Sequence, residues 1–488
     1  MIRRLVAVAL VVGAVLGLLR LDRSPEPASG REPSEQPAFA RSDRGSVWYC
    51  AQVPREGETV QVAVVNTGPR VARARISGYG AAPVEAVPAL NVEVGPRSRT
   101  VVAVSDLAAG LGGVVVELVG GPGLVEQRVT TEATSDVEAC TPDASTAWYF
   151  PMANTERGAS ARLTLMNPFP TDASVDVAVA YDEGGRVPPG LRGLVVAGGT
   201  TRVVELGEYL QRREQFTATV RARAGRLVAT LSQTGDGEGA GEGLVLHQGA
   251  SAPSDRWWFA DGVGAADVTE RFVIMNPADE AVSVGLSVTA DAADDLQPEP
   301  FVLDLPARRY AVVDLDRESR VPPTGRRWVE VVADGGVGVV VQRLLTVVGA
   351  GAEAAAVDRP PVADGLAASG GAAVVATEWV LGSIGLEDGP SVVVVANPDP
   401  SAIALVDLVA LREGEEVALS EQVEVPPGSS LAVDVTAALG GAEGAPVVVR
   451  ASTPVVVEAR LTSSTRRDVA VLTATPRAGA VGAPPGAG

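Results

Sequence analysis

Apolar residues in this chain come in short runs, and several of these runs alternate with polar residues. Examples are 174–180, 281–288 and 404–411, where the alternation has the period of a β-strand. Glycine and proline interrupt the chain about every eight to twelve residues, which is typical of sandwiches built from short strands. Helical spacing is scarce, and only 206–213 could form one or two helical turns. The pattern therefore predicts an all-β protein.

A tryptophan followed by an asparagine occurs four times and divides the chain into similar segments. The asparagine ends an apolar run and follows the tryptophan by 18, 19, 18 and 18 residues. The chain has only six tryptophans and six asparagines, so four of each on one pattern indicate an internal repeat. The motif residues are Trp48 and Asn66; Trp148, Asn167 and Pro168; Trp258, Asn276 and Pro277; and Trp379, Asn397 and Pro398.

Each copy also ends alike, with a strand, a turn and a second strand, which we interpret as a hairpin. The hairpins begin 48, 50, 52 and 50 residues after the motif asparagine. Two landmarks at near-constant separation define modules of roughly 100 residues, the usual size of an immunoglobulin-type sandwich. We expect four tandem immunoglobulin-like β-sandwiches at 46–143, 144–252, 253–348 and 374–475, with a linker at 349–373 and a disordered tail at 476–488.

The motif residues have structural explanations. Asparagine caps turns through its side chain and proline cannot donate to a sheet, so the pair ends a strand. The tryptophan has enough apolar area to fill one end of a small sandwich core. Neighbouring strand residues face opposite sides, so one aromatic of each pair should face outward. Tyr149 and Trp257 are therefore candidates for an aromatic surface that binds a ligand, although core packing is the more common role.

The N-terminus combines a short basic start with an apolar run, Leu5–Leu19. As a helix this run spans about 22 Å, less than the hydrocarbon core of a bilayer. Its length suits a signal peptide, yet no small-x-small cleavage site follows. We expect residues 1–21 to form an uncleaved signal anchor, with a cleaved signal and a buried cytosolic helix as alternatives. The basic start favours a cytoplasmic N-terminus. The Pro-, Ser- and Glu-rich residues 22–45 are expected to form a disordered stalk.

Two cysteines, Cys50 and Cys140, are the only ones in the chain, and they lie at the two ends of the first predicted sandwich. In an oxidising compartment we expect an intramolecular disulfide that ties the first strand to the last. Two buried free thiols and an intermolecular bridge are the alternatives.

Composition narrows the chemistry. A net charge of −20 argues against nucleic-acid binding, which needs a basic face. Without any lysine, Walker A and Schiff-base sites are excluded, and the single histidine, His247, we expect at the surface or on an edge. Sequence motifs for a metal or a cofactor are absent, so we expect neither. The composition still allows a pair of catalytic carboxylates of the kind that glycosidases use. The candidates Asp291, Asp294, Asp295 and Asp304 lie in loops or at strand ends and match no recognisable catalytic motif.

The aromatic openings of the copies, Trp48-Tyr49-Cys50 and Trp148-Tyr149-Phe150, and the Asn-Pro strand ends follow a basic, apolar N-terminus and a stalk. In this combination the chain resembles an uncharacterised family of exported actinobacterial proteins. The resemblance implies membrane-anchored, immunoglobulin-like domains and supplies no site residues. The chain departs from the family pattern at Asn66-Thr67-Gly68 and after Trp379, where aromatics are missing.

Taken together, these patterns favour a non-enzymatic protein of the cell envelope. We expect a single-pass protein of the cytoplasmic membrane with most of its chain outside, or a secreted protein if the N-terminal segment is cleaved. It would act as a scaffold or adaptor for an envelope protein, with no nucleic-acid partner. The alternative is an array of carbohydrate-binding modules that holds cell-wall glycan through exposed aromatics.

Overall fold

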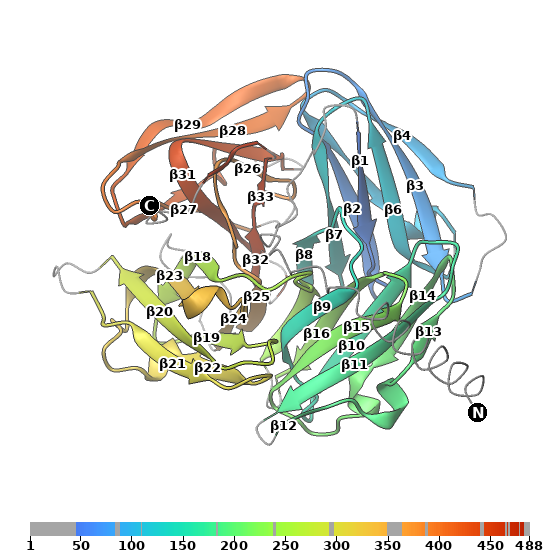
Figure 1. Cartoon of the computed structure of the whole chain (residues 1–488). Coiled ribbons are helices and arrows are strands. Elements are labelled where there is room, and N and C mark those ends of the chain that lie inside the picture. The colour runs from blue at the N-terminus through green and yellow to red at the C-terminus, as the bar shows by residue number, and fades with distance from the viewer. Residues whose placement is uncertain are drawn as a thin grey trace, which may run out of the picture. The chain divides into compact units, whose positions relative to one another are not determined.

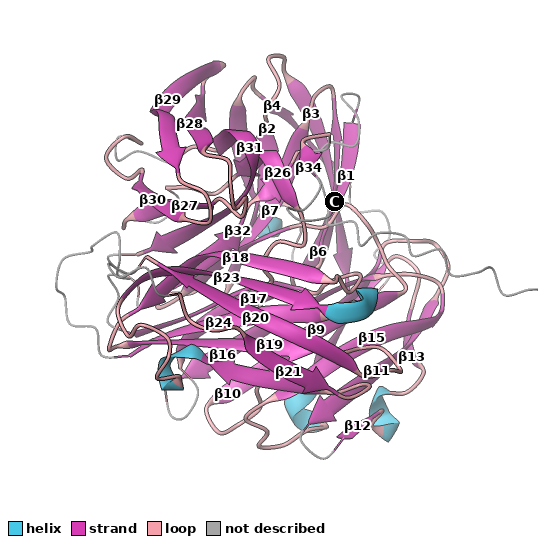
Figure 2. Cartoon of the chain, turned by 60° about the vertical axis from the view of Figure 1, so that its left-hand side comes forward, coloured by secondary structure: helices cyan, strands magenta, loops and turns pink. Residues whose placement is uncertain are grey.

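The computed structural model describes residues 45–82, 88–108, 110–181, 184–237, 241–291, 297–348, 364–385, 389–439, 444–463, 466, 469–477 and 479–482. The expected signal anchor at 1–21 and the stalk up to residue 44 lie outside these ranges. Within them, no helix is long and apolar enough to cross a membrane. The described chain is all-β, as predicted, and only single turns of 3-10 helix interrupt the strands (Figures 1 and 2).

The first sandwich has two four-stranded antiparallel sheets, β1-β6-β3-β4 and β5-β2-β7-β8. Their inward side chains form a single core that includes residues of both sheets. The strands are β1 (Gly45–Cys50), β2 (Thr59–Asn66), β3 (Ala72–Gly80), β4 (Leu90–Val94), β5 (Ser98–Ala103), β6 (Leu111–Val119), β7 (Gly123–Thr130) and β8 (Ser135–Ala139), and η1 is Val104–Asp106.

The second sandwich repeats this order with β9-β15-β11-β12, where β13 also pairs with β11, and β14-β10-β16-β17. Its strands are β9 (Ala147–Ala153), β10 (Ala159–Asn167), β11 (Ala173–Tyr181), β12 (Gly184–Arg186), β13 (Leu194–Val196), β14 (Thr200–Glu205), β15 (Phe216–Ala224), β16 (Val228–Asp236) and β17 (Glu242–Gln248); η2 is Pro189–Leu191 and η3 is Leu206–Glu208.

The third sandwich has the sheets β18-β23-β20-β21 and β22-β19-β24-β25. In β20 every second side chain is buried, which is the pattern expected of a strand with one face on the core. The strands are β18 (Arg256–Gly264), β19 (Val268–Met275), β20 (Val282–Ala290), β21 (Phe301–Leu305), β22 (Tyr310–Asp314), β23 (Gly325–Ala333), β24 (Val340–Val348) and β25 (Asp364–Ser369); η4 is Leu315–Arg317 and η5 is Asp334–Gly336.

In the fourth sandwich one long strand, β31, serves both sheets. Its first half pairs with β26 and β28, and its second half pairs with β27 and β32. The strands are β26 (Val375–Leu381), β27 (Ser391–Ala396), β28 (Ala404–Arg412), β29 (Glu415–Val425), β30 (Ser430–Asp434), β31 (Val447–Thr462), β32 (Val469–Thr473), β33 (Thr475–Pro476) and β34 (Val481–Gly482).

Sequence position does not reveal strand pairing, and the predicted terminal hairpins are wrong. In the first three sandwiches the two strands of each expected hairpin lie in different sheets; β6 pairs with β1 and β3, whereas β7 pairs with β2 and β8. An immunoglobulin constant domain instead pairs its first strand with its second and its sixth with its seventh. The sandwich architecture is present, but this connectivity is different, so the immunoglobulin-like assignment is not confirmed.

Two segments expected to lie outside the sandwiches contain strands. β25 lies within the predicted linker 349–373, yet it is the last strand of the third sandwich and pairs with β24 over six residues. In the predicted tail, β33 and β34 pair with β26. Sequence rich in alanine, glycine and proline predicted a linker in the first segment and disorder in the second, but small residues also allow close packing between neighbouring sheets. Residues 349–363 and 483–488 are not among the described residues.

The described residues of the four sandwiches contact one another in a closed cycle. The last strand of each second sheet takes part: β8 contacts β17 and β32, and β25 contacts the same two strands. The fourth sandwich thereby returns to the first, and Figure 1 shows β32 and β8 together near the middle of the molecule.

Candidate functional site

The motif asparagines are buried and join the two sheets of each sandwich. Asn397 is fully buried; its Oδ1 accepts the N–H of Asp399 at 3.1 Å. Its Nδ2 donates to the carbonyl oxygens of Ala402 and Val425 at 2.8 and 3.0 Å, and Val425 ends β29 in the opposite sheet. The other three asparagines, Asn66, Asn167 and Asn276, make the corresponding bonds. The predicted turn-capping role is confirmed, and the tie between sheets adds to it.

The motif tryptophan of the third copy is Trp257, one residue before the predicted Trp258. The indole Nε1 of Trp148 donates to the Leu227 carbonyl at 2.8 Å, and that of Trp257 donates to the Val339 carbonyl at 2.9 Å. These carbonyls occupy matching places, because Leu227 lies between β15 and β16 and Val339 lies between β23 and β24. A second tryptophan beside the first allowed the one-residue error. Trp48, Trp148 and Trp379 are fully buried, as predicted for core residues.

Trp258 instead corresponds to Tyr149, because each of them exchanges two backbone hydrogen bonds with one residue in a later segment of its own sandwich. Tyr149 bridges to Ala250, and Trp258 bridges to Ala372. The prediction that Tyr149 and Trp257 provide an exposed aromatic surface is wrong: they are 6% and 4% exposed. Every aromatic side chain among the described residues is buried or half-buried.

The residue after each motif tryptophan packs into the core of the next sandwich. Tyr49 packs against the second core, Tyr149 lies in the third core, and Trp258 lies in the fourth. Val380 completes the cycle, because it is fully buried in the core of the first sandwich. The side of the strand opposite its own core is therefore covered by a neighbouring sandwich, which explains why the second aromatic is buried.

Two glutamates at one register position reinforce this cycle. Glu126 in β7 accepts the Gly382 N–H of the fourth sandwich at 2.7 Å. Glu458 in β31 accepts the Asp261 N–H of the third sandwich at 2.8 Å. Each glutamate pairs with the strand residue that precedes the motif asparagine by three, so the two sites correspond. Burial raises the pKa of Glu126, against the pull of its hydrogen bonds.

A buried charge network surrounds Glu458. The Arg343 guanidinium lies 3.1 Å from Glu458 and 3.5 Å from Glu270, and Arg327 lies 2.7 Å from Glu270. Burial alone would lower the pKa of Arg343, but the attraction of Glu458 and Glu270 outweighs it and raises that pKa. Ser369 donates to the second oxygen of Glu458 at 2.9 Å. Charges on the third and fourth sandwiches thus compensate one another away from water.

A second set of carboxylates covers the edge of β17. Asp136 in β8 accepts the Leu246 N–H at 2.6 Å, and Glu138 accepts a backbone hydrogen bond from Gln248. Desolvation and the neighbouring Asp136 raise the pKa of Glu138 well above its ordinary value. Edge N–H groups invite unwanted pairing. Here the first sandwich satisfies those of the second with side chains.

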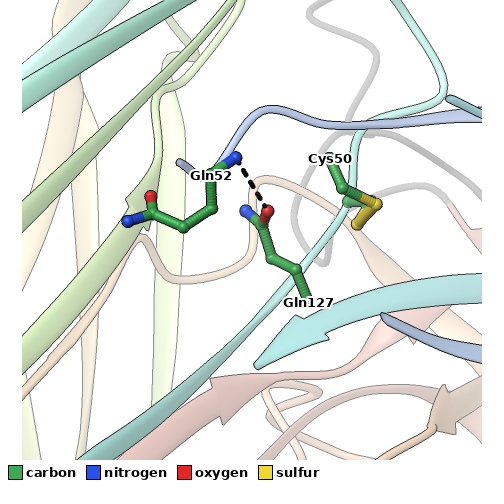
Figure 3. Close-up of a disulfide and its surroundings, with 4 residues drawn as sticks. Cys50, Gln52 and Gln127 are labelled. Carbon is green, nitrogen blue, oxygen red and sulfur yellow. Dashed lines mark hydrogen bonds between the residues drawn. A yellow bond between two sulfur atoms is a disulfide. The ribbon is translucent and has the colours of Figure 1, made fainter. Parts of the chain in front are cut away.

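The disulfide between Cys50 and Cys140 is present, as predicted, and links β1 to the segment after β8. Close to it, the Gln52 N–H donates to the Gln127 side chain at 3.3 Å, as Figure 3 shows. Cys50 is 2% exposed and Cys140 is 1% exposed. The bond therefore lies within the core of the first sandwich and is shielded from solvent.

A groove of about 460 Å³ lies between the first and second sandwiches. That volume is in the range of ligand sites. Glycine, alanine, valine and threonine form most of the wall, and Val195 remains half exposed. Arg202 is the one charged residue of the lining. The lining residues are Val53, Gly80, Ala81, Gly110 and Gly112 from the first sandwich, and Val195–Ala197 and Thr200–Val203 from the second.

The lining of this groove offers mainly apolar contacts. Within the described ranges no group of histidine, cysteine or carboxylate residues could hold a metal ion. Of the glycosidase candidates, Asp291 pairs with Arg326 and Asp304 lies on β21. Asp294 and Asp295 are not among the described residues. The sequence does not reveal the groove or the contacts between sandwiches, because both join segments from different copies.

No curated protein matches the chain. A Thermotoga maritima protein, "Thermotoga maritima 1070", is 18% identical over 25% of this chain and 94% of its own, at a TM-score of 0.20. The Anabaena sensory rhodopsin transducer is 22% identical over 19% and 88%, at 0.16. A family 32 glycoside hydrolase from Bifidobacterium adolescentis is 10% identical over 86% and 99%, also at 0.16. At these TM-scores the likenesses support no inference.

One protein-family model matches the chain, over residues 136–317. The matched range runs from β8 through the second sandwich and ends in η4 of the third. It covers less than half of the chain. Over these residues the chain is similar to the family of unknown function DUF5719.

Proposed function

We propose that the protein is a non-catalytic scaffold or adaptor of the cell envelope that holds a binding surface in a fixed orientation. The closed cycle of contacts carries this proposal. Tyr149, Trp258 and Val380 each insert into the next core and Tyr49 packs against it, so the four sandwiches restrain one another. A flexible string of modules would serve as a spacer, whereas a closed unit is suited to positioning a partner.

An extracytoplasmic location is part of the proposal. The Cys50–Cys140 disulfide supports it, because structural disulfides persist mainly in oxidising compartments. The apolar segment at 5–19 would provide the membrane anchor or the export signal. The net charge of −20 suits a soluble, self-repelling ectodomain rather than one that docks on anionic lipid.

The groove between the first and second sandwiches is the proposed contact surface. Its walls come from two sandwiches, so its shape depends on the packing between them. Its lining of small apolar residues fits apolar side chains from an envelope protein better than a charged metabolite. The carbohydrate-binding alternative loses its basis, because Tyr149 and Trp257 are buried.

The test is retention of a partner from detergent-solubilised envelope membranes by the immobilised, oxidised protein. We expect one defined membrane protein to be retained and Val195→Glu to reduce its retention at least tenfold. Val302→Glu is the matched control, because Val302 is an exposed strand valine of the third sandwich, 73% exposed against 51% for Val195. Deproteinised cell wall is the second sample. Retention on wall glycan alone, or equal loss in both variants, would contradict the proposal.

A further inference from the structure

A small cavity lies where the second sandwich meets the third. The second sandwich contributes residues of β9, β16 and β17, and the third contributes residues of β24 and β25. Its volume is about 10 Å³, far smaller than the groove. The lining residues are Met152, Leu231, Gln233, Val245, His247, Gln342, Leu344 and Ala368.

Two buried polar atoms of this lining have no hydrogen-bond partner in the protein. His247 is 5% exposed and its Nε2 is unpaired; Gln342 is 2% exposed and its Oε1 is unpaired. His247 was expected at the surface or on an edge; it lies on the edge strand β17, but the third sandwich covers it. A buried polar atom left unpaired costs about 1–3 kcal/mol. Because both unpaired atoms line the same cavity, one hydrogen-bonding group in that cavity could satisfy both.

Comparison with the same position in the first and fourth sandwiches shows that Gln342 lacks a hydrogen-bond donor. Gln342 pairs with Val273, three residues before Asn276, so it holds the register position of Glu126 and Glu458. Both glutamates accept a backbone N–H from the sandwich that precedes their own in the closed cycle, which is the fourth for Glu126 and the third for Glu458. Gln342 Oε1 accepts no such bond. In the third sandwich the cavity stands between this acceptor and the preceding sandwich.

We propose that the cavity binds one water molecule that bridges His247 Nε2 and Gln342 Oε1 across the boundary between the second and third sandwiches. The volume matches a single water, which needs about 10–15 Å³ of this kind of space and two to four polar partners. The water donates one hydrogen to Gln342 Oε1 and so supplies the donor that the glutamates obtain from the backbone.

The second partner is the imidazole of His247. Burial lowers the pKa of His247 to about 4, so the ring is neutral at pH 7. A neutral ring nitrogen is either a donor or an acceptor, and water can satisfy both forms. The Phe150 ring lies against the imidazole at 5.8 Å between centroids and in an edge arrangement, which fixes one side of the ring.

The direct test is a high-resolution crystal structure of the whole protein. We expect an isolated density peak at about 2.7–3.2 Å from both His247 Nε2 and Gln342 Oε1. No peak in the cavity, or a peak that contacts only one of the two atoms, would overturn the proposal. A peak with anomalous signal at about 2.0–2.3 Å from the imidazole would also overturn it, because that is a metal bond.

A double-mutant cycle tests the same site in solution. If one water joins the two side chains, His247→Leu and Gln342→Leu each lower the denaturation midpoint, and the double variant lowers it no further than the larger single shift. Additive shifts would contradict the bridge. The control combines His247→Leu with Asn397→Ala, since Asn397 is buried in the fourth sandwich and its hydrogen-bond partners are all in that sandwich. This pair should be additive.

Discussion

Glu458 accepts the backbone N–H of Asp261 at 2.8 Å, and this bond joins the fourth sandwich to the third. The same relationship joins Glu126 of the first sandwich to Gly382 of the fourth. Glu458 also contacts Arg343, and all these groups are buried. A repeated position in the sandwich thus carries the contacts that close the cycle, and replacing it should affect packing between sandwiches before it affects any one of them.

Removal of Glu458 should destabilise the protein strongly. Glu458→Ala leaves the buried Arg343 without its nearer carboxylate, and breaking a buried ion pair costs about 3–5 kcal/mol. The measurement is the free energy of unfolding in denaturant. Glu93→Ala is the control, because the Arg73–Glu93 pair is exposed and such pairs contribute about 0–1 kcal/mol. Equal effects of the two variants would show that the network does not hold the sandwiches together.

The motif asparagines should be far more sensitive than asparagine at the surface. Asn397→Ala deprives the Ala402 and Val425 carbonyls of their donor, and each unsatisfied buried group costs about 1–3 kcal/mol. We expect a clear fall in the free energy of unfolding. Asn91→Ala, at an exposed position on β4, should change little. A wild-type denaturation midpoint in Asn397→Ala would contradict the assigned tie between sheets.

The buried imidazole should make stability depend on pH. The pKa of His247 is about 4 in the folded protein and about 6.5 when unfolded, so the unfolded chain binds the extra proton first as pH falls. Stability from this group is complete above pH 6.5 and is lost between pH 6.5 and 4, by about 3 kcal/mol.

The comparison that isolates this effect is between the wild type and His247→Leu. Glu126 and Glu138 have raised pKa values, so they change stability with the opposite sign in acid. These carboxyls are common to both proteins and cancel in the difference. Unfolding free energies at pH 7.5, 6 and 5 should therefore converge for the two proteins as pH falls. A constant difference would indicate that His247 is not buried in its neutral form.

Reduction of the disulfide should lower stability through the unfolded state. The bond between Cys50 and Cys140 closes a loop of 90 residues, for which the chain-entropy model gives about 4–5 kcal/mol as an upper figure. We expect a lower melting temperature after reduction of the unfolded chain and refolding without oxidant. Cys50→Ser/Cys140→Ser should match the reduced protein and be insensitive to reductant. An unchanged melting temperature would mean that the bond adds no stability.

Local sequence predicted many of the strands and the turns that follow the motif asparagines. The alternation of apolar residues identified strands such as β20, and the asparagine at each strand end identified the turn that follows. These features depend on neighbours within a few residues, so their signals are visible in the chain itself. The disulfide could also be predicted, because two cysteines offer only one pairing within the molecule.

Tertiary structure alone decided how the sandwiches meet. Strand alternation places Tyr149 on the face opposite Trp148, but whether that face meets water or another sandwich depends on segments distant in the chain. The same holds for His247, which lies on an edge strand and is nevertheless buried. Burial of a strand's second face, the pairing of strands across sheets, and the position of Glu458 beside Arg343 result from packing among whole sandwiches. Residue periodicity carries no record of that packing, because it reports which residues share a face and not what covers it.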